Sequence, residues 1–70
     1  EFRQISSKLW EIKIATGSAG YRIFYVTLKK DVLVLLHAYK KQSQKAPKKE
    51  IAIAEQRLIE VLNNESFYFR

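Results

Sequence analysis

The sequence has no cysteine and no methionine, and it contains only one proline, one histidine and two glycines. Without cysteine the chain has no disulfide, no thiolate metal site and no thiol nucleophile. With a single histidine we expect no metal site, and we expect no cofactor. The absence of methionine predicts that a segment has been removed upstream of residue 1.

Long apolar runs are missing as well. The longest such stretch, VLVLLHAY, is interrupted by His37 and is far shorter than the roughly 20 residues that span a bilayer. No signal-peptide pattern opens the chain. We therefore expect a cytoplasmic protein with no membrane partner.

Positive charge is the most prominent feature of the composition. Thirteen Lys and Arg against seven Asp and Glu give a net charge of +6 and a pI of about 9.8. This balance favours a polyanionic partner, nucleic acid or ribosome before acidic membrane, although basic charge alone also serves solubility. Seventy residues form one domain at most, and we expect a single domain over residues 1–70 with a thin margin of stability.

Three stretches read as strands. LWEIKI, from Leu9 to Ile14, alternates apolar and polar residues, as a half-buried strand does. ATGSAG forms a turn, and YRIFYVTL, residues 21–28, is joined by KKD to VLVLLHAY, residues 32–39. Because this last stretch is apolar on both faces, we expect it to be the central strand of an antiparallel sheet.

The period changes after Gln42. Pro47 suits the first turn of a helix, with Ser43 or the preceding backbone as its cap. Asn63 and Asn64 end the helix, and SFYFR is expected to add an edge strand. The prediction is an α+β fold, a small antiparallel sheet packed by a C-terminal amphipathic helix. One apolar stripe of this helix faces the sheet: Ile51, Ala54, Leu58, Val61 and Leu62.

Lysines concentrate where the last strand ends and the helix begins. A helix N-terminus attracts phosphate, and nearby lysines strengthen that field. The cluster is therefore interpreted as a phosphate-docking, RNA-binding surface, the alternative being a solvated linker that only maintains solubility. Its residues are Lys40, Lys41, Lys45, Lys48 and Lys49.

Arg22 lies in an apolar strand, where an unpaired guanidinium is costly to bury. Its partner is either a structural carboxylate such as Glu11 or a phosphate held bidentately. Pairing across the glycine turn brings Lys13 beside Arg22, which favours an anion between them. His37 is either a satisfied core residue or a proton-transfer group. Tyr39 either packs in the sheet or stacks on RNA bases.

No nucleophile, glycine-loop or metal-ligand motif is present in the sequence. One reaction needs only basic residues: RNA cleavage, in which the substrate's 2′-OH attacks the adjacent phosphate. A lysine, histidine or tyrosine then moves protons while an arginine stabilises the extra negative charge. The candidate catalytic residues are Lys13, Arg22 and His37.

The run from Leu9 to about Leu62 resembles the HigB-like, often phage-associated branch of the RelE/ParE toxin superfamily. LLHAYKKQSQKAPKKEI is its most specific part, with YRIFY beside it. The resemblance implies a type II toxin that cleaves mRNA on the ribosome and is held inactive by an antitoxin with a helix-turn-helix domain. The alternatives are a ParE-like toxin that binds DNA gyrase and a basic RNA-binding module without catalysis.

By resemblance, Arg22 matches the family's phosphate-contacting arginine and Lys13 a basic position on the preceding strand. Lys40 and Lys41 match the basic end of the last long strand. Members usually begin with a helical hairpin, of which EFRQISSK is expected to be the last turn. Without the hairpin one sheet face is uncovered, which predicts a homodimer through that face and leaves open whether this chain is active.

Overall fold

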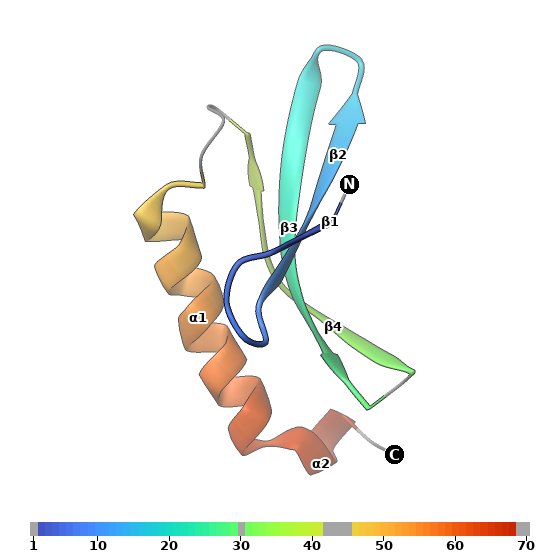
Figure 1. The fold of residues 1–70 in the computed structure, drawn as a ribbon, viewed down its shortest axis with the longest axis vertical. Helices are drawn as coiled ribbons and strands as arrows, with labels where there is room; N and C mark the ends of the chain where they lie inside the picture. The colour runs from blue at the N-terminus through green and yellow to red at the C-terminus, as the bar shows by residue number, and fades with distance from the viewer. Residues whose placement is uncertain (1, 30, 42–45, 69–70) are drawn as a thin grey trace.

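The structure is a computed structural model that describes residues 2–29, 31–41 and 46–68. The strands β1 to β4 pair in chain order into one antiparallel sheet, and a long helix follows them. Figure 1 shows α1 lying along one side of this sheet. The expected α+β fold is confirmed. The elements are β1 (Phe2–Gln4), β2 (Trp10–Thr16), β3 (Ala19–Leu28), β4 (Val32–Lys40), α1 (Lys48–Asn63) and α2 (Glu65–Tyr68).

The β2–β3 hairpin turns at Gly17, whose φ of +58° lies in the left-handed region that favours glycine. The tight turn fixes the register, so Lys13 lies directly opposite Arg22. The sequence predicted both the hairpin and this pair, and both are confirmed. Because residues opposite one another in register point to the same side of the sheet, this pair fixes the faces of β2 and β3. In β4 the register shifts between the partners of Phe24 and Tyr25, so the alternation of faces changes between Leu35 and His37.

The expectation that VLVLLHAY forms the central strand was wrong. Among the described strands, β4 pairs only with β3 and lies at an edge of the sheet, whereas β3 lies between β2 and β4. The apolar residues on both faces of β4 have another cause. One of its faces packs on the core, and the other carries Leu33 and Leu35, which are 53% and 64% exposed. Both residues belong to the sheet face opposite α1, here called the open face.

The hydrophobic core lies between the sheet and α1. Ala54, Leu58 and Val61 of the helix are buried, and Ile51 and Leu62 pack against the same cluster, which confirms the predicted stripe. The helix begins after Pro47, whose carbonyl accepts hydrogen bonds from the first turn, and its C-cap is Asn64. The sheet and loop contribute Leu9, Phe24, Val26, Leu28 and Leu36 to this core.

Both ends of the chain differ from the sequence expectation. Phe2–Gln4 is a strand, not the last turn of a helix, because it pairs with β2 and Phe2 packs edge-to-face on Tyr25 at 6.3 Å. Glu65–Tyr68 is a helical turn and not an edge strand. Segments this short have no periodicity that separates helix from strand. Pairing with β2 decides the first segment, and the second follows α1 directly, with Phe67 donating its backbone N–H to the Asn64 carbonyl. Ser43, Lys45 and Arg70 lie outside the described residues.

Candidate functional site

Two neighbouring cross-strand rows of the sheet bring the charged candidates together on the face that α1 packs against. We call them the charged rows. They are joined by side-chain contacts between β1, β2 and β3 as well as by backbone register. The first row contains Arg3, Glu11, Phe24 and His37, and the second contains Lys13, Arg22 and Tyr39.

Glu11 is the centre of the charged rows. Its carboxylate accepts hydrogen bonds from Arg22 Nη1 at 3.3 Å and 3.1 Å, and neither side chain is exposed. Arg3 Nη2 approaches the same carboxylate at 3.3 Å, and its side chain is 46% exposed. Two guanidinium charges and one carboxylate leave this cluster at net +1, and Lys13 raises the charge of the rows to +2. Of the two partners that the sequence left open for Arg22, the carboxylate is present.

Tyr39 is half-buried, and its ring packs against Phe24 and His37 with centroid distances of 5.8 and 6.2 Å. Its hydroxyl is buried without a hydrogen-bond partner among the described residues. Burial raises the pKa of the Tyr39 phenol above its ordinary value, and the carboxylates of Glu11 and Glu50 act in the same direction, against the Arg22 guanidinium. The phenol is therefore protonated at neutral pH and can only donate or accept a hydrogen bond.

His37 bridges β4 to α1. Its Nε2 lies 2.6 Å from Glu50 Oε1, and Arg57 Nη1 lies 3.4 Å from its Nδ1 and 2.9 Å from the Leu36 carbonyl, to which it donates. A guanidinium only donates, so this arrangement fits the neutral tautomer with the proton on Nε2. Both ring nitrogens then have protein partners, as expected of a satisfied core histidine.

The lysines of the predicted cluster lie at one end of the fold. Lys40 ends β4 and is exposed, and Lys41, half-buried, continues the pairing by donating its backbone N–H to Gly20. Lys48 and Lys49 are exposed in the first turn of α1. Figure 1 shows the end of β4 and the start of α1 near each other in space. The fifth lysine, at position 45, falls in the undescribed segment.

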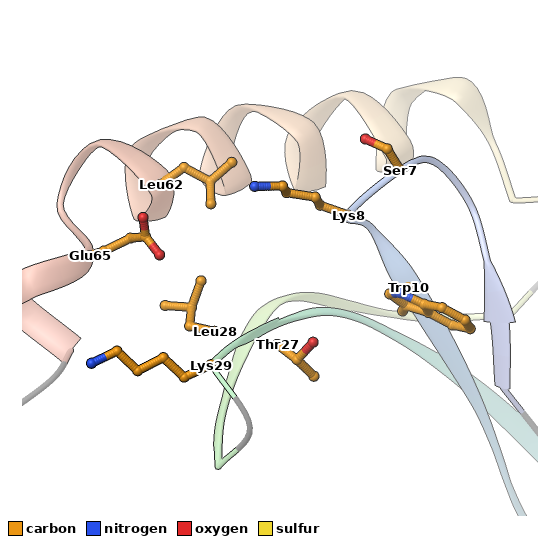
Figure 2. A pocket seen from close by; sticks show the side chains of 8 residues that line it. All are labelled: Ser7, Lys8, Trp10, Thr27, Leu28, Lys29, Leu62 and Glu65. Carbon is orange, nitrogen blue, oxygen red and sulfur yellow. The ribbon is translucent and has the colours of Figure 1, made fainter.

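A hollow of about 230 Å³ lies at the other end of the fold, where the β1–β2 loop, the end of β3 and the C-terminal turns meet. Figure 2 shows Lys8 and Leu62 on one side of it and Leu28 and Lys29 on the other. Among the predicted site residues that the structure describes, none lines this hollow. It is therefore separate from the charged rows.

The described part of the chain contains no group of three His, Asp or Glu residues that would hold a metal ion. Among these same residues, no helix is long and apolar enough to cross a membrane. The charged rows carry guanidinium, ammonium, phenol, imidazole and carboxylate groups. Groups of these types can contact anions and take part in proton transfer.

The family described as "Phage derived protein Gp49-like (DUF891)" matches residues 1–59, which is most of the chain. The chain belongs to this family. Gp49-like proteins are a family of RelE/HigB-type toxins and are associated with toxin–antitoxin systems, so an antitoxin partner is indicated. No curated protein and no solved structure is detectably similar to the chain.

Membership in the Gp49-like family agrees with the resemblance found in the sequence, at the level of the toxin family. Sequence reasoning missed three members of the site: Arg3, Glu50 and Arg57. Glu50 and Arg57 lie seven residues apart on α1, which is a two-turn helical spacing. That spacing places Glu50 and Arg57 on one face of the helix, and it was the sequence signal that could have indicated their contacts with His37. Arg3 had no signal, because its place depends on β1 pairing with β2.

Proposed function

We propose that this chain is the toxin component of a type II toxin–antitoxin system and an mRNA endonuclease that acts on the ribosome. The observation that carries the proposal is the placement of Lys48 and Lys49, both exposed, in the first turn of α1. Cations there face the positive end of the helix dipole, and the one carboxylate of this turn, Glu50, is already in contact with His37, so a bound phosphate would offset both positive fields. Exposed Lys40 at the end of β4 adds to the same field.

In the proposed reaction the 2′-oxygen of the RNA attacks the adjacent phosphorus. The new P–O2′ bond forms as the P–O5′ bond breaks, and the 2′-hydroxyl proton is lost while the 5′-oxygen gains one. The cations of the charged rows offset the negative charge that develops on the phosphate oxygens. DNA lacks the 2′-OH and is not cleaved by this route.

Partners follow from the same charges and surfaces. The net charge of +6 favours ribosomal and messenger RNA, and a cytoplasmic location follows from that substrate. An antitoxin with a helix-turn-helix domain is the proposed inhibitor. The open face, with Leu33 and Leu35 exposed, supports the proposal that two copies associate through it.

Induced expression of the gene, with its antitoxin absent, tests the proposal. Early loss of translation with mRNA cut at ribosome-occupied codons is the expected result. DNA damage with an SOS response would instead indicate a gyrase-binding toxin of the ParE type. Normal growth together with RNA binding would indicate an RNA-binding module without catalysis.

A further inference from the structure

Arg3 is the solvent-exposed member of the ion cluster around Glu11. Its side chain is 46% exposed, whereas the side chains of Glu11 and Arg22 are fully buried. A phosphate arriving from solvent therefore meets the guanidinium of Arg3 before it can meet that of Arg22. This accessibility separates the two arginines of the charged rows, although both contact the same carboxylate.

We infer that Arg3 binds the phosphate of the RNA directly and that Glu11 and Arg22 are positioning residues for it; this inference rests on the proposed function. A guanidinium has five N–H donors in a planar fork. The contact between Arg3 Nη2 and Glu11 Oε1, at 3.3 Å, involves one nitrogen of a side chain that is 46% exposed, so a phosphate can reach this guanidinium from solvent. Two N–H donors of such a fork match the spacing of two phosphate oxygens.

The contact with Glu11 prepares Arg3 for this role. A free surface arginine loses much rotamer freedom when it binds, and that loss reduces affinity. Here β1 pairing places Arg3 directly opposite Glu11, and the carboxylate already holds the guanidinium. Arg22 in turn fixes Glu11 through both of its oxygens, so the three residues form one pre-organised unit.

The negative charge of Glu11 does not prevent anion binding at Arg3. Arg22 offsets the carboxylate, so the cluster keeps net +1, and Lys13 in the neighbouring row adds a second positive charge. The exposed lysines at the start of α1 attract RNA as point charges. Only a guanidinium adds forked geometry to that attraction.

Binding of a short labelled single-stranded RNA, measured by fluorescence anisotropy over a range of salt concentrations, tests the inference. Arg3→Ala should weaken binding by about tenfold and lower the salt slope by about 0.7, the value for one phosphate contact on a single strand. Its urea midpoint should stay close to that of the unaltered protein, because Glu11 keeps Arg22. Arg3→Lys should restore the slope but only part of the affinity.

Lys8→Ala is the matched control, since it removes one exposed positive charge from the β1–β2 loop, beside the 230 Å³ hollow and away from the charged rows. It should leave the salt slope unchanged. Equal losses in Lys8→Ala and Arg3→Ala, or unchanged binding in Arg3→Ala, would overturn the role of Arg3 and leave the proposed function standing. If the unaltered protein neither binds RNA nor cleaves mRNA, the proposed function fails, and the role of Arg3 fails with it.

Discussion

Arg22 Nη1 donates to both carboxylate oxygens of Glu11, at 3.3 and 3.1 Å, inside a fold where neither side chain is exposed to solvent. A buried ion pair contributes little net stability when it forms, because both charges lose their hydration. Removing one partner is far more damaging, since the other charge remains buried without compensation. Losing one member of the pair therefore costs more stability than the intact pair contributes.

Arg22→Ala is expected to destabilise the protein by about 3 kcal/mol, the lower end of the range for breaking a buried pair, because Arg3 still lies 3.3 Å from the Glu11 carboxylate. A domain this small has a free energy of unfolding of about 5–10 kcal/mol in total. The variant should therefore unfold at a much lower urea concentration than the unaltered protein. Urea denaturation followed by circular dichroism measures the effect. The sequence left a carboxylate and a phosphate open as partners of Arg22, and the burial of Arg22 with Glu11 now predicts that this residue is needed for folding.

The double variant Glu11→Ala with Arg22→Ala provides the control for this prediction. Removing both charges leaves a cavity but no isolated buried charge, so the double variant should be more stable than Arg22→Ala alone. If the double variant is destabilised by the sum of the two single changes, the two residues are not coupled and the interpretation fails.

The bridge from His37 to Glu50 is expected to stabilise the docking of α1 on β4. Glu50→Gln keeps the shape of the side chain but weakens the acceptor of a 2.6 Å contact. We expect a loss of about 1 kcal/mol in the free energy of unfolding, at the modest end because both groups are partly exposed. Urea midpoints at neutral pH measure it.

Glu60→Gln is the comparison for that measurement, because Glu60 is an exposed glutamate of the same helix. It should change the unfolding free energy by less than about 0.5 kcal/mol. Equal effects of the two substitutions would mean that helix charge, and not the bridge to His37, determines the result.

The parts of the fold that the sequence predicted are those determined by local spacing. The stripe on α1 follows from a 3.6-residue period, and the Lys13–Arg22 pair follows from a tight turn with a period of two. The edge position of β4 did not follow, because alternation reports which faces are apolar and not which strands are neighbours. The same limit hid Arg3, whose role arises only when β1 pairs with β2.

The C-terminal tail and the candidate site likewise contain features that the sequence predicted and features that only the fold determines. SFYFR has strand composition, yet residues 65–68 turn as a helix directly after Asn64. The lysines of the candidate site were predicted from composition, because a cluster of positive charge is visible in the sequence without knowledge of which residues it contacts. The contacts of His37 with Glu50 and Arg57 needed the helix to be placed against the sheet.

Ionisation of the Tyr39 phenol should lower the free energy of unfolding at alkaline pH. Burial raises the pKa of its phenol in the folded chain, whereas the unfolded chain ionises near its ordinary value of about 10. This contribution is fully present below about pH 10, and it is lost as pH rises from there through the folded pKa, because the unfolded state releases its proton first.

Tyr39→Phe should reduce this alkaline loss while leaving stability at neutral pH unchanged or slightly higher, because the hydroxyl has no partner among the described residues. Urea midpoints of the two proteins compared at each pH remove the shared contribution of lysine titration. An identical alkaline slope in both proteins would show that Tyr39 ionises alike in the folded and unfolded chains.

Self-association through the open face should strengthen as salt rises, whereas RNA binding should weaken. Each copy carries +6, so two copies repel one another until salt screens the charge, while the apolar contact itself is not screened. Sedimentation velocity at increasing salt measures this self-association.

The double substitution Leu33→Gln with Leu35→Gln should abolish the association, because these exposed leucines supply the apolar area. Ile59→Gln, at a residue 52% exposed on α1, should leave it intact, and an equal effect there would place the contact on the helix instead.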